Sequence, residues 1–149
     1  MFSRESLLKK LETITDFRDF ASDRIEVLEF GHTDFSSSSS EQIIIVHRGS
    51  RTDFSDALGF WLASLFSQDW LGRDEYALPY ACQGLCLEIN ATEFEVLIKE
   101  YSGTLRTPLE LPMASEFRGG LKMFHDWNDV AALAELEDGF MAFYWSTTA

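Results

Sequence analysis

Four consecutive β-branched residues, Ile43 to Val46, constrain the fold of this chain more than any other stretch. Successive side chains of a strand point to opposite faces of its sheet, so an unbroken apolar run predicts a strand that is buried on both faces. We therefore expect 42–48 to be a central strand rather than an edge strand. The run leads directly into the polar residues 47–51, with the sequence HRGSR.

A second strand that is covered on both faces is expected near the C-terminus. In residues 140–147 the odd and the even positions both carry aromatic rings, so rings point to both sides of the strand. Asp138 and Gly139 precede this segment, and an Asp-Gly pair between apolar runs is a strong signal for a hairpin. The first arm of that hairpin, 130–137, also contains good helix formers.

Two amphipathic helices are predicted from apolar residues that recur at steps of three and four. The first covers 2–21, with Ser3 as its N-cap. The second is the central helix over 51–72, whose N-cap is expected among the polar residues of 52–55. Gly72 is the expected end of this helix.

The remaining segments predict short strands that are separated by connectors. We expect Ile25 and Val27 to face inward from the first strand, and a pair of strands around Asn90. For the second strand of that pair, a helix over 92–101 is the competing interpretation. The predicted strands are 24–31, 85–89 and 94–101, and the predicted connectors are 32–42, 73–84 and 104–120.

These elements predict an α+β protein, because the strands come in adjacent pairs and do not alternate regularly with helices. We expect a mostly antiparallel sheet of about five to six strands, an N-terminal helix and one central amphipathic helix. The 149 residues suffice for a single globular domain, 1–149, with its own core. A flexible Ser-rich loop is expected at 32–42, where five serines follow one another.

The net charge of −13, from 25 acidic residues against 12 Lys and Arg, narrows the classes of partner. Such a charge repels the phosphates of nucleic acids and the surfaces of anionic membranes. It attracts basic proteins. Ten of the acids lie in two acid-only segments that contain no Lys or Arg, 74–98 and 124–149.

Location and cofactors follow from what the sequence contains. No apolar stretch is long enough to span a membrane and no signal peptide is recognisable, so we expect a cytoplasmic protein. Cys82 and Cys86 then stay reduced and serve as small apolar residues. The spacing of Cys, His, Asp and Glu fits no common metal site, and we expect neither a metal nor another cofactor.

Aromatic residues interleaved with acids are typical of a surface that binds a basic protein, because rings provide buried contacts and carboxylates attract the partner. In charge, size and predicted layout the chain resembles small acidic inhibitors such as the immunity proteins that neutralise bacterial toxins. This resemblance implies inhibition of a basic partner, for example a nuclease-type toxin, by covering its cationic site. The predicted partner-binding residues are Trp70, Asp74, Glu75, Tyr76, Asp126, Trp127, Asp129, Glu135, Glu137 and Asp138.

The turn at 47–51 supports a different interpretation, a small ligand-binding or enzymatic domain with an anion site before a helix N-terminus. Pairing of its two arginines with acids such as Asp53 and Asp56 is the simpler expectation. Ser50 lacks the Gly-x-Ser-x-Gly context of a nucleophile, so we expect no enzyme. A nucleic-acid mimic and a subunit of a larger assembly are further alternatives. The anion-site residues in this interpretation are His47, Arg48, Ser50 and Arg51.

Overall fold

An antiparallel sheet of six strands organises the described part of the chain, which is residues 1–36, 41–68 and 74–148 of a computed structural model. The spatial order of the strands is β1-β2-β6-β5-β4-β3. The predicted α+β class, with its mostly antiparallel sheet, is confirmed. The strands are β1 (Glu26–Phe30), β2 (Gln42–Ser50), β3 (Leu87–Ile89), β4 (Phe117–Asp126), β5 (Asp129–Leu136) and β6 (Gly139–Thr147).

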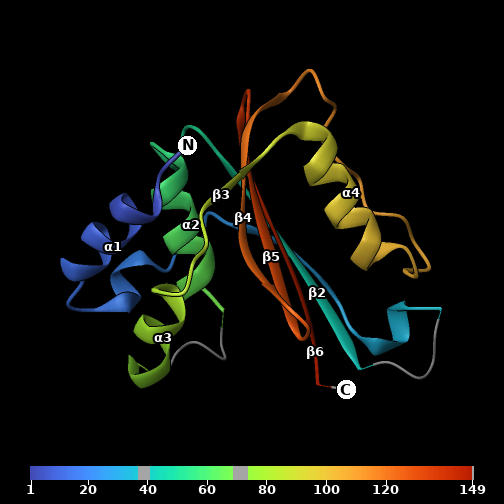
Figure 1. Cartoon of the computed structure of the whole chain (residues 1–149), viewed down its shortest axis with the longest axis horizontal. Helices are drawn as coiled ribbons and strands as arrows, with labels where there is room; N and C mark the ends of the chain where they lie inside the picture. The colour runs from blue at the N-terminus through green and yellow to red at the C-terminus, as the bar shows by residue number, and fades with distance from the viewer. Residues whose placement is uncertain (37–40, 69–73, 149) are drawn as a thin grey trace.

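Helices cover both faces of this sheet. In the described residues they are α1 (Arg4–Glu12), α2 (Ala57–Phe66), α3 (Asp74–Ala81) and α4 (Ala91–Ser102), with short 3-10 helices η1 (Phe17–Phe20) and η2 (His32–Asp34). Figure 1 shows the sheet nearly edge-on at the centre, with α1, α2 and α3 on one side and α4 on the other. The predicted N-terminal and central helices correspond to α1 and α2.

Strands β2 and β6 lie inside the sheet, as their sequences predict. β2 pairs with β1 on one side and with β6 on the other, and β6 also pairs with β5. Phe140 and Tyr144 of β6 pack in the core beneath α2, whereas Phe143 and Trp145 pack beneath α4. Rings on both faces of this strand are therefore explained by helices on both faces of the sheet.

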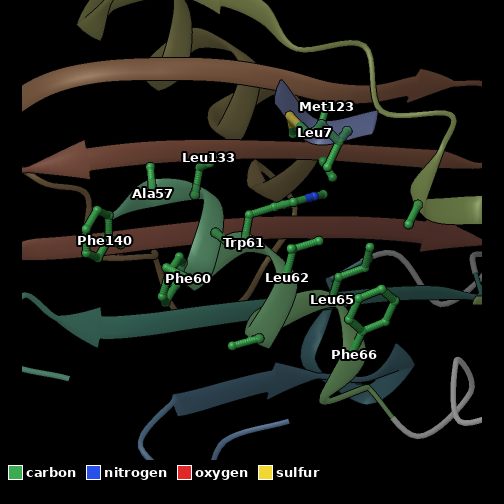
Figure 2. Packing of buried hydrophobic residues seen from close by; sticks show 14 of the residues in the cluster. Leu7, Ala57, Phe60, Trp61, Leu62, Leu65, Phe66, Met123, Leu133 and Phe140 are labelled. Carbon is green, nitrogen blue, oxygen red and sulfur yellow. The ribbon is translucent and has the colours of Figure 1, made fainter. Parts of the chain in front are cut away.

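The larger core lies between α2 and the sheet (Figure 2). All residues of α2 from Phe60 to Phe66 are buried. Phe60 stacks on Phe140 with ring centroids 5.4 Å apart, and Trp61 stacks on Tyr144 at 5.5 Å. Many of the aromatic residues thus serve the core, where each ring buries a large apolar area.

The segment 94–101 is helical, so the strand predicted there is wrong and the competing helix is confirmed. Asn90 and Glu93 form a reciprocal capping box: each side chain accepts the backbone N–H of the other residue, at 2.9 and 3.0 Å. Phe94, Leu97 and Ile98 then lie at helical spacing and are buried against the sheet. The capping box and this apolar stripe outweigh the strand propensity of the segment.

Local side-chain hydrogen bonds shorten the first predicted helix. Ser3 caps α1 as predicted, because its hydroxyl accepts the backbone N–H of Ser6. The helix ends at Glu12, however, and does not continue to residue 21. The side chain of Asp16 accepts the N–H of Arg18 and begins the separate helix η1, in the way that short polar side chains compete with helix continuation.

The second predicted helix begins later than expected. Its N-cap is Asp56, whose carboxylate accepts the N–H of Gly59 at 2.7 Å, so the predicted cap among 52–55 is wrong. Phe54 is buried before the helix and packs edge-on against Phe60. The predicted helix end at Gly72 and residues 37–40 of the Ser-rich loop lie outside the described residues.

Two segments that were predicted as connectors form regular structure. The segment 73–84 contains α3, with Pro79 inside the helix. Ala77 and Ala81 of α3 are fully buried in the larger core, and this burial offsets the hydrogen bond that the proline cannot donate.

The predicted connector 104–120 is also partly wrong, because β4 begins at Phe117. A Cβ atom on Gly120 would lie 2.7 Å from the ring of Phe117. The glycine that suggested a loop therefore makes room for a ring within a strand.

Strand β1 forms one edge of the sheet. Ile25, just before it, is buried as predicted. Val27 is 51% exposed, so the prediction that it faces inward is wrong. Alternation in the sequence predicts correctly which residues of β1 share a face. It does not show how much of the protein covers that face, and few of the described residues pack over this edge strand.

Candidate functional site

The turn between β4 and β5 presents a large aromatic side chain to solvent. Asp126 ends β4, Asp129 begins β5, and these two residues face each other in register. Trp127, between them, is 73% exposed, the largest value for any large apolar side chain in the described residues. We call residues 126–129 the Trp127 turn. In the sequence Trp127 stands between two acidic residues, the combination predicted for a protein-binding surface.

Tyr80 of α3 joins this turn to the first acid-only segment. Its hydroxyl donates a hydrogen bond of 2.5 Å to Oδ2 of Asp129. Burial raises the pKa of Asp129 in spite of this hydrogen bond, and the nearby Asp126 raises it further. Burial also raises the pKa of Tyr80, which therefore stays a donor. Tyr76 lies one helical turn before Tyr80 and is 58% exposed.

We expect Tyr80→Phe to destabilise the protein by about 1–2 kcal/mol at pH 7, because a partly buried carboxylate loses its donor. The loss should shrink at a pH low enough to protonate Asp129, since a neutral carboxyl group needs that donor less. Urea denaturation at pH 7 and pH 4 measures both values. Tyr76→Phe is the matched control, and an equal loss in both variants at pH 7 would contradict this role of Tyr80.

A groove of about 290 Å³ lies between α4 and the strands β3 and β4, beside this turn. We call it the α4–β4 groove. His125, two residues before Trp127, lines it, and its Nε2 lies 3.5 Å from the hydroxyl of Tyr101. Nζ of Lys122 lies 3.4 Å from Nδ1 of the same imidazole. The remaining lining residues combine apolar and acidic side chains: Ile89, Thr92, Glu93, Val96, Leu97 and Glu100.

Three of the predicted partner-binding acids lie at the other end of the strands. Strand β5 has eight residues, which places its ends roughly 23 Å apart. Glu135 lies 3.8 Å from the guanidinium of Arg51, and Glu137 lies 3.6 Å from that of Arg118. Asp138 is exposed beside them in the β5–β6 turn. Glu135 and Glu137 thus face arginines, and none of the three acids joins the Trp127 turn.

The other predicted partner-binding residues lie on or before α3. Asp74 and Glu75 form its first turn, but their side chains are outside the described set. Trp70 is outside the described residues altogether. The two acid-only segments therefore meet where Tyr80 contacts Asp129, along the α4–β4 groove and in the core beneath α4.

The residues of the alternative anion site do not all converge: Arg48 and Ser50 line one hollow of about 360 Å³, but His47 and Arg51 do not. His47 is buried in the sheet face beneath α2. Arg48 points to the other face, where its guanidinium donates to the carbonyl oxygen of Glu110 at 2.9 Å. The hydroxyl of Ser50 donates to the carboxylate of Asp53 at 2.9 Å. The structure therefore does not bring His47 and Ser50 together as a base and a nucleophile.

Arg51 holds the β5–β6 turn instead of an open site. Its guanidinium donates to the carbonyl oxygens of Leu136 and Glu137, at 2.5 and 2.9 Å. It also lies over the ring of Phe140, 5.2 Å from its centroid. The expected pairing with acids is seen for Arg51, whose partner is Glu135. The examples Asp53 and Asp56 are wrong, because Asp53 accepts from Ser50 and Asp56 caps α2.

A buried polar network that sequence reasoning missed connects α2 to the sheet. Nδ1 of His47 lies 2.6 Å from the hydroxyl of Ser64, which lies 2.7 Å from the hydroxyl of Tyr144. Burial lowers the pKa of His47 to about 4 and raises that of Tyr144, so both side chains are neutral at pH 7. The available signal was a polar residue on the apolar face of each of the three elements. The network satisfies polar groups that are buried in the core between α2 and the sheet.

Both cysteines are free and partly buried. Burial raises the pKa of Cys86 to about 11, so its thiol stays protonated at neutral pH. Among the described residues, no group of three or more His, Cys, Asp or Glu side chains is arranged to hold a metal ion. No helix in the same residues has the length and apolar character needed to cross a membrane.

Comparison of the chain with protein-family models, with curated proteins and with solved structures finds no match.

Proposed function

We propose that this protein binds and inhibits a basic partner protein through the Trp127 turn and the α4–β4 groove. The observation that carries this proposal is the exposed side chain of Trp127 in the turn that joins Asp126 to Asp129. Burial of an aromatic ring on binding increases the affinity of the complex, and carboxylates around the ring attract cations and fix their orientation.

The charge of the chain supports a basic partner. A net charge of −13 accelerates association with a cationic protein and keeps polyanions away. The two acids of the turn lie close enough for Asp126 to raise the pKa of Asp129. A Lys or Arg of the partner placed between them would relieve this repulsion, so the turn gains more from a cation than an isolated carboxylate does.

The partner class that we propose is a cationic enzyme with a polyanionic substrate, such as a nuclease-type toxin. Such an enzyme has a basic cleft, and an acidic protein that covers this cleft inhibits it without any chemistry of its own. Inhibition of this kind agrees with the resemblance to immunity proteins in charge and size. A toxin that acts inside cells would require its inhibitor in the cytoplasm.

We expect Trp127→Ala to weaken binding to such a partner about 30-fold, which corresponds to roughly 2 kcal/mol for an aromatic hot spot. Asp126→Asn should mainly slow association and reduce its dependence on salt. Biolayer interferometry against a panel of nucleases with isoelectric points above about 9 measures both effects, at low salt and at about 0.15 M salt.

Two variants at the opposite end of the sheet are matched controls for this experiment. Met113→Ala removes an exposed apolar side chain near the start of β4, and Asp138→Asn removes a carboxylate from the β5–β6 turn. Both should keep the affinity of the unmodified protein within about twofold. Two results would contradict the proposed surface. One is an affinity that does not depend on salt, and the other is an equal loss of affinity in Met113→Ala and Trp127→Ala.

A further inference from the structure

The free edge of β1 is a second surface that needs an explanation. β1 lies at one end of the sheet and, among the described residues, pairs only with β2. Val27 is 51% exposed and Leu28 is 44% exposed. Consecutive residues of a strand lie on opposite faces, so a partner that docks on one face covers only one of these side chains. A strand added at the edge covers both of them.

A hollow beside β1 provides space for the side chains of an added strand. It has a volume of about 390 Å³ and lies on the face that α4 covers elsewhere. Leu28, Phe30 and Val46 line it on the sheet side, and residues 107–110 line it on the other. An apolar side chain next to Leu28 on this face would enter the hollow and bury these apolar walls.

Two exposed glutamates, Glu26 and Glu29, flank the apolar pair Val27-Leu28. Residues directly opposite each other in an antiparallel pair lie on the same face of the sheet, so two copies of β1 can pair Val27 with Val27 or Leu28 with Leu28. In the first register Glu26 of each copy lies opposite the apolar Leu28 of the other, and in the second Glu29 lies opposite Val27. Charged side chains in these positions of an edge strand oppose self-pairing.

We propose that β1 is the docking site for an extended strand of a basic partner protein with the sequence pattern basic–apolar–apolar–basic. In an antiparallel register its apolar residues lie opposite Val27 and Leu28, and its cations lie opposite Glu26 and Glu29. Arg48, the neighbour of Glu26 on β2, directs its guanidinium to the carbonyl oxygen of Glu110. The choice of a basic partner rests on the proposed function, but the surface is separate from the Trp127 turn.

The test uses a labelled peptide that carries Lys-Val-Val-Lys between Ser-Gly flanks. We expect it to bind in fluorescence anisotropy and to slow amide hydrogen exchange in 26–30. Glu26→Lys/Glu29→Lys should weaken this binding roughly tenfold, because two attractive pairs become repulsive. The same variant should prefer a Glu-Val-Val-Glu peptide. Glu12→Lys/Glu88→Lys is the matched control: it changes the net charge equally, and Glu88 lies on the opposite edge strand β3.

Each outcome decides the inference. Peptide binding that both double variants weaken equally, or slower exchange at the Trp127 turn in place of 26–30, overturns it. A dimer of the unmodified protein in sedimentation, with 26–30 protected, also overturns it. Where the lysine variant does not fold, Glu26→Gln/Glu29→Gln serves, and it should lose the preference for the basic peptide. The proposed function fails separately, through unchanged nuclease binding by Trp127→Ala, which this peptide does not probe.

Discussion

Gly139→Ala is expected to destabilise the protein by about 3 kcal/mol, one of the largest losses from a single added methyl group. A Cβ atom at this position would lie 2.2 Å from the carbonyl oxygen of Gly49. Both atoms are fixed to the backbone, so no side-chain rotation relieves the contact. Strands β2 and β6 would have to separate where Ser50 pairs with Gly139. The free energy of unfolding in urea, followed by circular dichroism, measures the loss.

Two other glycines provide the controls. A Cβ atom on Gly31 meets nothing within 4 Å, and one on Gly119 in β4 comes no closer than 3.9 Å to a methionine side chain. Neither Gly31→Ala nor Gly119→Ala should cost more than about 0.5 kcal/mol. If Gly139→Ala were as stable as these two variants, close approach of β2 and β6 would not explain the glycine.

Acidification from pH 7 to pH 4 is expected to destabilise the protein by about 3 kcal/mol through His47 alone. Burial lowers its pKa in the folded protein to about 4, against an ordinary value of 6.5 in the unfolded chain. Below pH 6.5 the unfolded chain therefore takes up a proton that the folded protein does not. The penalty grows until the pH reaches about 4 and is absent above pH 6.5.

His47→Gln isolates this contribution from the many carboxylates that also titrate. Glutamine keeps an uncharged polar group for Ser64 but takes up no proton, so its stability should fall less steeply between pH 6.5 and 4. His32→Gln, at an exposed position in η2, should keep the slope of the unmodified protein. Parallel curves for His47→Gln and the unmodified protein would show that the buried imidazole does not control this pH range.

The interior of the sheet was predictable because its sequence signal is local and unambiguous. The run Ile43–Val46 and residues 140–145 are apolar or aromatic at every position, and only a strand with helices on both faces accommodates such patterns. The α4 helix was harder, because its apolar residues fit both periods and only the capping box of Asn90 and Glu93 decides between them. The helix α3 was missed because Pro79 suggested a loop. Burial of the helix in the core compensates for the hydrogen bond that this proline cannot donate.

The candidate site was only partly predictable, for a geometric reason. Asp126 and Asp138 are close in sequence and share one acid-only segment, but a whole strand separates them. One group of acids lies beside Tyr80 and the other beside arginines. This placement depends on the order of strands in the sheet, which no local sequence pattern encodes. The network of His47, Ser64 and Tyr144 is equally non-local, because it joins three elements that lie far apart in the sequence.

The central position of β6 has a consequence for how the chain folds. Residues 42–50 of β2 pair with residues 139–147 of β6, so about two thirds of the sequence separates the two sides of the middle of the sheet. Before β6 is synthesised, β1–β2 and β3–β4–β5 are two half-sheets with no strand between them. Proteins whose contacts join residues far apart in the sequence fold slowly, on the scale of milliseconds to seconds. During that interval the apolar flanks of both half-sheets are open, and a chaperone that holds them would act before the last strand inserts.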